Sequence, residues 1–292
     1  MLRYIYDNFL DEKQKYRVKQ YYRRIDRVIT GLFFSYDYKE LRHALQKLGL
    51  RRGDTVLMHS AFHYSNGFKG TPQDVINCLI EVLGEDGNLL MVSMPYRSSS
   101  YEYLSKKPIF DIRKTPSEMG IISEIFRRKS GVFRSQHPTH PILAFGKDAA
   151  RITEGHHVCV YPLGKDSPFD KFRILKGKIL FFNVPFDTFT FIHYIEDLTK
   201  EKVPLSIYSD DLMSAKMIDY SGNCLHVNTY VFSNEAVTLR NPKKLETNLI
   251  KYKMLKRHKT GRTHLMLVSA EDAITCTYKM LEKNIYFYDL VK

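Results

Sequence analysis

From about residue 39 onward, the apolar positions of the chain alternate between a helical period and short strand-like runs. In the segment 72–83, Pro72 and Gly84 stand where a helix begins and ends. After about residue 205 the pattern changes to strands separated by turns such as Ser221-Gly222-Asn223. The expected helices cover 39–48, 72–83, 116–128, 190–198 and 270–283, and the expected strands cover 55–59, 88–92 and 178–183. This alternation predicts an α/β layered domain with a mixed sheet.

Residues 1–38 differ from the rest, because one face of their predicted helix is apolar and the other is basic. The apolar positions are Val18, Tyr21, Tyr22, Ile25, Val28, Ile29 and Leu32. The basic positions are Lys13, Lys15, Arg17, Lys19, Arg23, Arg24 and Arg27. We therefore expect a basic amphipathic helical extension at 1–38 and one further domain at 39–292. Two roles stay open for the helix: packing on the domain, or contact of residues 13–32 with a membrane surface or a partner.

The composition of the 292 residues is that of a globular protein with a sizeable core, at 43% hydrophobic and 26% charged residues. Its apolar runs are too short to span a bilayer, and its first residues lack a signal-peptide core. The four cysteines lie far apart, without a spacing for zinc or redox chemistry. These features predict a cytoplasmic protein, and peripheral attachment at the inner face of the membrane stays open.

The net charge of +13, from 45 Lys+Arg against 32 Asp+Glu, favours anionic partners such as phosphorylated cofactors. Nucleic acid is not expected among them, because zinc-finger spacing, RNP-like strands and a basic zipper are absent from the sequence. The sequence also lacks GxGxxG, Walker and GxSxG motifs, which argues against dinucleotide, nucleotide triphosphate and serine hydrolase chemistry.

The sharpest local pattern is the segment 187–197, DTFTFIHYIED, which follows a predicted buried strand. Asp187 or one of the two threonines after it can cap the helix that the segment opens. His193 and Glu196 are three residues apart and share a face of that helix. The carboxylate can fix the imidazole tautomer and favour its protonated form, which would tune the ring as a general base. The alternative is a core histidine that is hydrogen-bonded to a neighbouring acid.

The segment 134–141, RSQHPTHP, combines prolines with many hydrogen-bond donors. Such a stiff loop suits an anion or a reacting carbonyl, and the alternative is a rigid surface loop without a ligand. His137 and His140 have a ligand-like spacing, but a third ligand is not nearby in the sequence, so we expect no metal. Ser60 lies at the carboxyl end of a predicted strand, the edge where α/β sheets bind ligands.

Taken in order, several segments resemble the aminoglycoside 3-N-acetyltransferase family, over roughly residues 39 to 283. The segments are LQKLGLRRGDTVLMHSA (45–61), GEDGNLL (84–90), FD (110–111), TPSEMG (115–120), FRRKSGVFRSQHPTHPILAFG (126–146), SPF (167–169), HYIE (193–196) and a weaker stretch at 261–279. The resemblance implies a three-layer α/β/α sandwich with a mixed central sheet. It also implies direct transfer of acetyl from acetyl-CoA to an amine, without an acyl-enzyme.

In this family the histidine of an H-x-x-E element removes the amine proton, and that histidine matches His193, with Glu196 orienting it. The resemblance assigns the acetyl-CoA side to Ser60 and to three residues of the 134–141 loop. These loop residues are Arg134, Ser135 and His137, and Arg134 is the expected contact of the CoA phosphates.

Two features depart from the family pattern. Members often have Pro-Thr where this chain has Met94-Pro95-Tyr96, which moves the expected hydroxyl to Ser93 or Tyr96 or removes it. The second departure is charge, because aminoglycosides are polycations and a strongly basic protein repels them at long range.

We therefore expect the acceptor to be an amino sugar on an anion, such as a nucleotide- or lipid-linked precursor of a surface polysaccharide. Asp210 and Asp211 are the expected acceptor-binding acids. One alternative is an aminoglycoside-acetylating resistance enzyme, and another is a catalytically silent acyl-CoA-binding or anion-binding protein. A homodimer stays open.

Overall fold

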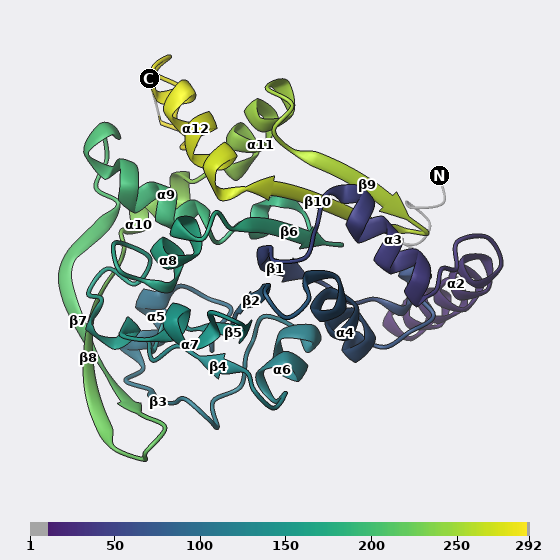
Figure 1. The fold of residues 1–292 in the computed structure, drawn as a ribbon, viewed down its shortest axis with the longest axis horizontal. Helices are drawn as coiled ribbons and strands as arrows, with labels where there is room; N and C mark the ends of the chain where they lie inside the picture. Colours follow the sequence, from purple (N-terminus) through teal and green to yellow (C-terminus); the bar gives the residue numbers. More distant parts are fainter. Residues whose placement is uncertain (1–10, 291–292) are drawn as a thin grey trace.

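The computed structural model describes residues 11–290, which surround a central seven-stranded sheet (Figure 1). Its strands are β1 (Thr55–Ser60), β2 (Asn88–Val92), β4 (Phe133–Arg134), β5 (Ile142–Gly146), β6 (Lys178–Phe182), β9 (Lys256–Thr260) and β10 (Thr263–Ser269), in the order β4-β5-β2-β1-β6-β10-β9. β1 pairs in parallel with β2 and β6, whereas β5, β4, β10 and β9 are added antiparallel. The sheet is therefore mixed, as expected.

Helices cover both faces of this sheet, because alternate residues of its buried strands point to opposite sides. Val56 and Met58 pack in the core under one set of helices, and Leu57 packs in the core under the other. The first set is α3 (Tyr38–Leu48), α4 (Pro72–Leu83) and α6 (Ile121–Arg127), and the second includes α7 (Ala149–Thr153), α8 (Pro168–Ile174), α9 (Ile192–Thr199) and α12 (Ala270–Leu281). The expected three-layer α/β/α sandwich is confirmed.

Several predicted elements end where local side chains stop them. α4 has the predicted bounds, because Thr71 and Asp74 form a capping box before Pro72 and Gly84 follows at a φ of 66°. The helix predicted at 116–128 is shorter, since the chain forms a turn up to Gly120 at a φ of 107° and α6 starts only after it.

A second, three-stranded sheet was not expected. It contains β3 (Ile109–Asp111), β7 (Tyr208–Ile218) and β8 (Cys224–Phe232), with β7 and β8 forming a long antiparallel hairpin beside the main body (Figure 1). Only β9 and β10 of the late strands join the central sheet. The remaining short elements are α5 (Ser100–Ser105), α10 (Asn234–Leu239), α11 (Pro242–Lys251), η1 (Tyr64–Asn66), η2 (His156–Val158), η3 (Phe186–Thr188) and η4 (Lys200–Lys202).

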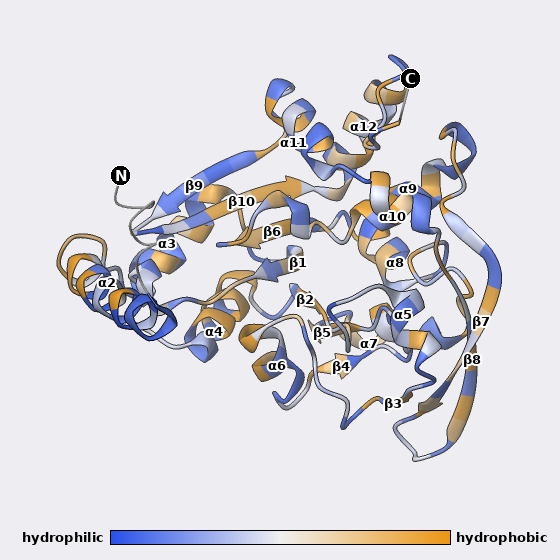
Figure 2. Ribbon diagram, turned by 180° about the vertical axis from the view of Figure 1, so that it is seen from behind, coloured by the Kyte–Doolittle hydropathy of each residue, from blue (hydrophilic) through white to orange (hydrophobic). Residues whose placement is uncertain are grey.

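The basic segment near the N-terminus forms the helix α2 (Glu12–Phe33), which is capped by Asp11 and projects from the domain (Figures 1 and 2). Its end is anchored by the buried Thr30 and by an ion pair between Asp26 and Arg262. After α2 the chain enters the core at Tyr36, whose buried hydroxyl lies 2.6 Å from the hydroxyl of Thr263.

Residues 1–10 of the expected extension lie outside the described residues. Within 11–290, none of the helices has both the length and the apolar character that a bilayer-spanning segment requires.

Candidate active site

The expected pair of His193 and Glu196 lies on one face of α9, just beyond β6 and η3. The Nδ1 atom of His193 is 2.7 Å from Oε2 of Glu196, as the spacing of three residues on a helix allows. The Glu196 side chain is completely buried, whereas the His193 side chain keeps 20% of its surface exposed and lines a cleft. Glu196 is therefore held in the core, whereas the His193 ring can be reached from the cleft.

Two residues from later in the chain complete the surroundings of the Glu196 carboxylate. Arg240 Nε donates to Oε1 at 2.6 Å, and the Tyr288 hydroxyl donates to the same oxygen. A β-bridge between Arg240 and Tyr288 brings these two residues together. Both carboxylate oxygens thus accept hydrogen bonds, which fixes the orientation of the group that holds His193.

The electrostatics of this cluster keep His193 neutral. Burial alone would raise the pKa of Glu196, but His193 and Arg240 lower it through hydrogen bonds and charge. The pKa of His193 is itself lowered, because burial and the positive charge of Arg240 outweigh the attraction of Glu196. Glu196 favours the protonated ring, as expected, but burial and then the charge of Arg240 outweigh it, so the net shift of the His193 pKa is downward.

The hydrogen bond to Glu196 also selects the tautomer. An ionised carboxylate only accepts hydrogen bonds, so Nδ1 of the neutral His193 ring carries the proton and Nε2 carries the lone pair. Within residues 11–290, the bond from Nδ1 to Glu196 is the one hydrogen bond that the His193 ring makes. The ring is thereby prepared to accept a proton from a group in the cleft.

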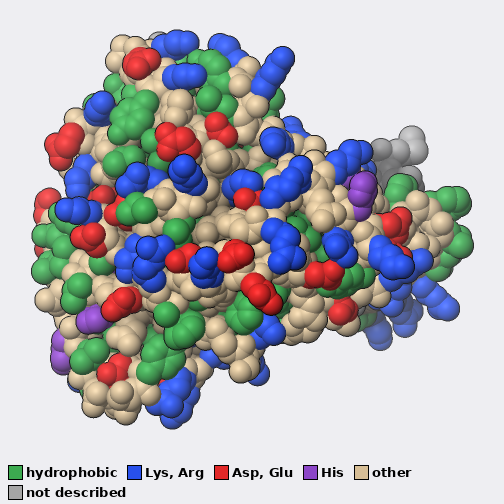
Figure 3. All heavy atoms as spheres, in the orientation of Figure 1, with side chains coloured by type: hydrophobic (Ala, Val, Ile, Leu, Met, Phe, Trp, Pro, Cys, Tyr) green, Lys and Arg blue, Asp and Glu red, His purple; other side chains and the backbone are tan. Residues whose placement is uncertain are grey.

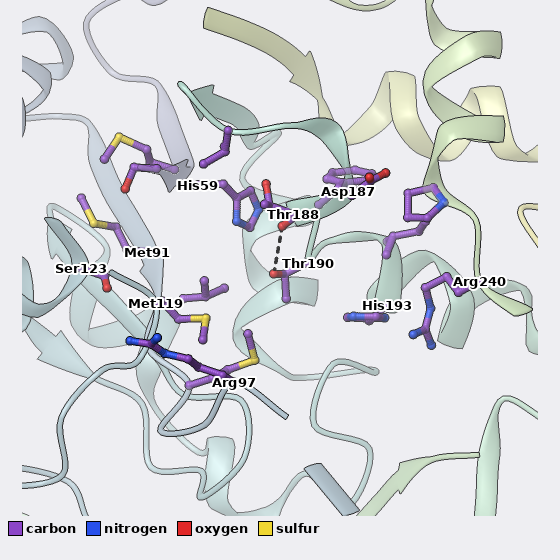
Figure 4. Close-up of a pocket in the computed structure, with 18 of the residues that line it drawn as sticks. His59, Met91, Arg97, Met119, Ser123, Asp187, Thr188, Thr190, His193 and Arg240 are labelled. Atoms are coloured by element: carbon purple, nitrogen blue, oxygen red, sulfur yellow. Dashed lines mark hydrogen bonds between the residues drawn. The ribbon is translucent and has the colours of Figure 1, made fainter. Parts of the chain in front are cut away.

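The cleft beside His193 has a volume of about 470 Å³ and lies where the parallel strands β1, β2 and β6 end (Figure 4). Ser60 lines it from the end of β1, as its predicted position at the sheet edge implied. Arg97 and Arg240 line it too, and each is paired with a glutamate, Arg97 with Glu118 at 2.9 Å. The lining therefore combines apolar side chains such as Met91 and Met119 with polar ones, and both of its arginines are paired with acids.

His59, which precedes Ser60 near the end of β1, also lines the cleft. It is 4% exposed, and its Nε2 is buried without a hydrogen-bond partner in the part of the chain that the structure describes. Burial and the nearby His193 lower the pKa of His59 to about 3, so its ring is neutral at pH 7. The sequence feature that could have identified His59 as a cleft residue is its position next to Ser60 at the end of a predicted strand.

Asp187 also lines the cleft, although the sequence suggested that it, or a neighbouring threonine, would cap the helix. That expectation is wrong, because α9 begins after Phe191 without any side-chain cap. The segment forms the 3-10 turn η3 first, and the Thr190 hydroxyl donates to the carbonyl of Thr188, the last residue of that turn. The exposed Asp187 carboxylate is thus an acid beside the cleft that contains His193 (Figure 4).

Arg134 lies inside the protein rather than at the cleft. It is 3% exposed, donates to the carbonyls of Ser93 at 2.8 Å and Thr115 at 2.6 Å, and stacks over Phe110 at 4.6 Å. Burial lowers its pKa to about 9. This position does not support the expected contact with CoA phosphates, because the guanidinium is already enclosed by backbone acceptors.

The rest of the 134–141 loop is buried as well, apart from the half-buried Gln136, so the alternative of a surface loop is wrong. The Ser135 hydroxyl lies 2.8 Å from Nδ1 of His156, and the His137 ring packs against the His156 ring in a tilted arrangement, with 4.6 Å between the ring centroids. Neither residue lines the cleft, so their expected contacts with acetyl-CoA gain no support from their positions. His140 is near enough to His193 for the two rings to interact: burial and then the proximity of His193 lower the pKa of His140.

Asp210 and Asp211 lie on β7 with exposed side chains, and neither lines the cleft. Asp210 instead borders a separate surface depression together with Tyr161 and Lys200. The structure therefore does not bring the two expected acceptor-binding acids to His193. Among residues 11–290 there is also no cluster of three or more histidine, cysteine or acidic side chains that could hold a metal ion.

A family model described as aminoglycoside 3-N-acetyltransferase matches residues 57–282, which is most of the chain. The chain belongs to this family. Curated relatives agree: aminoglycoside N(3)-acetyltransferase III of Pseudomonas aeruginosa is 29% identical over 185 residues, covering 59% of this chain and 68% of the relative. An enzyme of the same name from Acinetobacter baumannii is 24% identical over 269 residues, covering 84% and 91%.

Solved structures of the family share the fold of this acetyltransferase. Aminoglycoside acetyltransferase AAC(3)-Xa has a TM-score of 0.74 at 23% identity and covers 90% of this chain and 99% of its own. The YokD protein of Bacillus subtilis has a TM-score of 0.70 at 25% identity, covering 86% and 95%. The expected family and enzyme class, an acyltransferase with acetyl-CoA as cosubstrate, are confirmed.

Proposed function

We propose that this acetyltransferase moves the acetyl group of acetyl-CoA to an amino group of an aminoglycoside, with His193 as the general base. The observation that carries the proposal is the geometry of the His193 ring, which is fixed at Nδ1 by the buried Glu196 and lines the cleft with part of its surface exposed. The family match and the names of the relatives support an aminoglycoside acceptor.

The reaction needs a base because an amine attacks only through its lone pair. The amine nitrogen forms a bond with the thioester carbonyl carbon while its proton passes to Nε2 of His193. The tetrahedral intermediate then collapses, the carbon–sulfur bond breaks, and CoA leaves as a thiolate that takes up the proton. The ionised Glu196 carboxylate stabilises the positive charge that the His193 ring gains in this step.

The two substrates require separate contacts in the cleft. Ser60, at the end of β1, supplies a hydroxyl for the thioester side. Asp187 supplies a carboxylate for an ammonium group of the acceptor, in place of Asp210 and Asp211. A relative of known structure, AAC-IIIb, was solved in a binary complex with CoASH, which supports a CoA site on this fold.

An amino sugar carried on an anion is the second candidate acceptor. The net charge of +13 attracts such a molecule at long range, and Arg97 and Arg240 line the cleft. We place it second because the family and its curated relatives bear the name of aminoglycosides.

A panel assay separates the two acceptors. CoA release is measured with several aminoglycosides and several nucleotide-linked amino sugars, and the acetylated product is identified by mass. We expect a higher kcat/KM for an aminoglycoside, and reduced susceptibility of a bacterial host that expresses the enzyme. A higher kcat/KM for every nucleotide-linked amino sugar would replace the first candidate by the second.

A further inference from the structure

The helix α2 exposes an apolar stripe that the domain does not cover. Val28, Leu32 and Phe33 have exposed fractions of 58%, 71% and 75%, and Tyr21 and Tyr22 exceed 60%. The spacing of these residues places them on one side of the helix. Such a stripe on a projecting helix costs free energy in water, which indicates that something binds there.

The flanks of the stripe are strongly basic. The exposed cations of α2 are Lys13, Arg17, Lys19, Arg24 and Arg27, whereas its acids are Glu12 and Asp26, and Asp26 is paired with Arg262. In Figure 3 the surface over α2 carries apolar and basic side chains next to each other. This charge favours an anionic partner and opposes the pairing of α2 with a second copy of itself.

The basic surface continues onto the neighbouring hairpin. Arg262, in the turn between β9 and β10, joins that hairpin to α2 through its ion pair with Asp26. Lys256 and Lys259 on β9 are exposed as well. A broad cationic surface beside an exposed apolar helix face matches the interface of an anionic bilayer, where apolar side chains enter the headgroup region and cations contact lipid phosphates.

We propose that α2 is a reversible membrane-docking helix, which lies on an anionic lipid surface with Tyr21, Tyr22, Val28, Leu32 and Phe33 inserted at the headgroup level. Lys13, Lys19 and Arg24 contact the phosphates. The aliphatic part of the stripe favours lipid over single-stranded nucleic acid, whose bases stack on aromatic rings rather than on valine and leucine. Docking through α2 concerns a surface distinct from the cleft and does not depend on the identity of the acceptor.

Sedimentation with vesicles tests the proposal on the full chain. We expect binding to vesicles that contain phosphatidylglycerol to be at least ~10-fold tighter than to pure phosphatidylcholine at low salt, and to weaken at high salt. The variant Lys13→Gln/Lys19→Gln/Arg24→Gln should reduce partitioning roughly 100-fold. Its matched control, Lys114→Gln/Lys165→Gln/Lys176→Gln, removes three cations from other parts of the surface and should bind like the wild type.

The apolar stripe has its own pair of variants. Val28→Gln/Leu32→Gln should weaken partitioning about 10-fold, whereas Val158→Gln/Ile174→Gln, at two exposed apolar positions elsewhere, should not. The sequence contains no tryptophan, so Phe33→Trp gives a single reporter whose emission should shift to the blue on vesicles, unlike that of Ile174→Trp.

Three results would overturn the proposal. The first is equal loss of binding in each variant and its control, which would assign attachment to the overall charge. The second is a dimer in lipid-free solution that Val28→Gln/Leu32→Gln dissociates. The third is tighter binding of single-stranded DNA than of anionic vesicles.

Discussion

Two histidine-bearing regions of the molecule, the helix α9 and the loop 134–141, contain similar residue types but have different environments. On α9, His193 keeps part of its ring exposed to the cleft and is held by an acid whose charge Arg240 compensates. In the loop, His137 is fully buried, and Arg134 donates to backbone carbonyls.

The difference teaches that solvent access and charge compensation, rather than residue type, separate a reactive histidine from a structural one. Burial strongly lowers the pKa of His137, so that ring stays neutral and enclosed. The pKa of His193 is also lowered, but its Nε2 is beside a cleft where a substrate can reach it. The sequence offered both regions as sites, and only the folded chain distinguishes them.

The largest expected effect comes from the variant His193→Ala. Loss of the base should reduce kcat by roughly 10²–10⁴-fold and leave the fold intact, as measured by CoA release and circular dichroism. As the control, His137→Ala should lower the thermal stability and leave kcat of the folded fraction near that of the wild type. Near-full activity of His193→Ala would remove this residue from the mechanism.

Glu196→Gln should reduce kcat by roughly 10- to 100-fold, less than His193→Ala, because the glutamate orients the base without taking the proton. The variant also leaves the buried Arg240 without its counter-ion, so the free energy of unfolding should fall by about 3–5 kcal/mol. Denaturant unfolding and steady-state kinetics measure the two effects separately. Unchanged values in both would show that the carboxylate neither holds the ring nor compensates Arg240.

Asp187→Asn should raise KM for a cationic acceptor about 10-fold and leave KM for acetyl-CoA unchanged, because a charge-assisted contact with the ammonium group is lost. The variants Asp210→Asn and Asp211→Asn are the matched controls and should behave like the wild type. If Asp210→Asn and Asp211→Asn raised this KM and Asp187→Asn did not, the two acids of β7 would be the acceptor site instead.

The smallest effect on catalysis is expected for Arg134→Met. This variant should leave KM for acetyl-CoA within about twofold of the wild type, since the guanidinium does not reach the cleft. The free energy of unfolding should fall by about 2–4 kcal/mol, because buried carbonyls lose their donor. A large rise in that KM with unchanged stability would return Arg134 to the CoA site.

The sequence predicted those parts of the fold that local patterns determine. The bounds of α4 and β2 follow from a capping box, a proline, a glycine and an apolar run. The β7–β8 hairpin is local, but its separation from the central sheet as part of a β3-β7-β8 sheet could not be predicted, because β3 pairs with residues of β7 about 100 positions away. The shortened α6 depends on the turn before Gly120, which a helical period does not reveal.

In the candidate site, too, the local contacts could be predicted from the sequence and the long-range contacts could not. His193 and Glu196 are one helical turn apart, so their contact was predictable. Arg240 and Tyr288 are 44 and 92 residues away from Glu196 in the sequence, so no local pattern predicts that they contact it. The burial of the His193 ring and the charge of Arg240, which together lower the pKa of His193, are likewise not visible in the local sequence.

The central claim is that His193 is a neutral base with its proton on Nδ1, and NMR of the ¹⁵N-labelled histidine rings tests it most directly. Loss of one signal in His193→Ala assigns the ring in the wild-type enzyme. We predict a pKa below the ordinary histidine value of 6.5 and the Nδ1–H tautomer at pH 7, so that acid removes activity only below that value. A pKa of about 7 or higher, or the Nε2–H tautomer, would contradict the account.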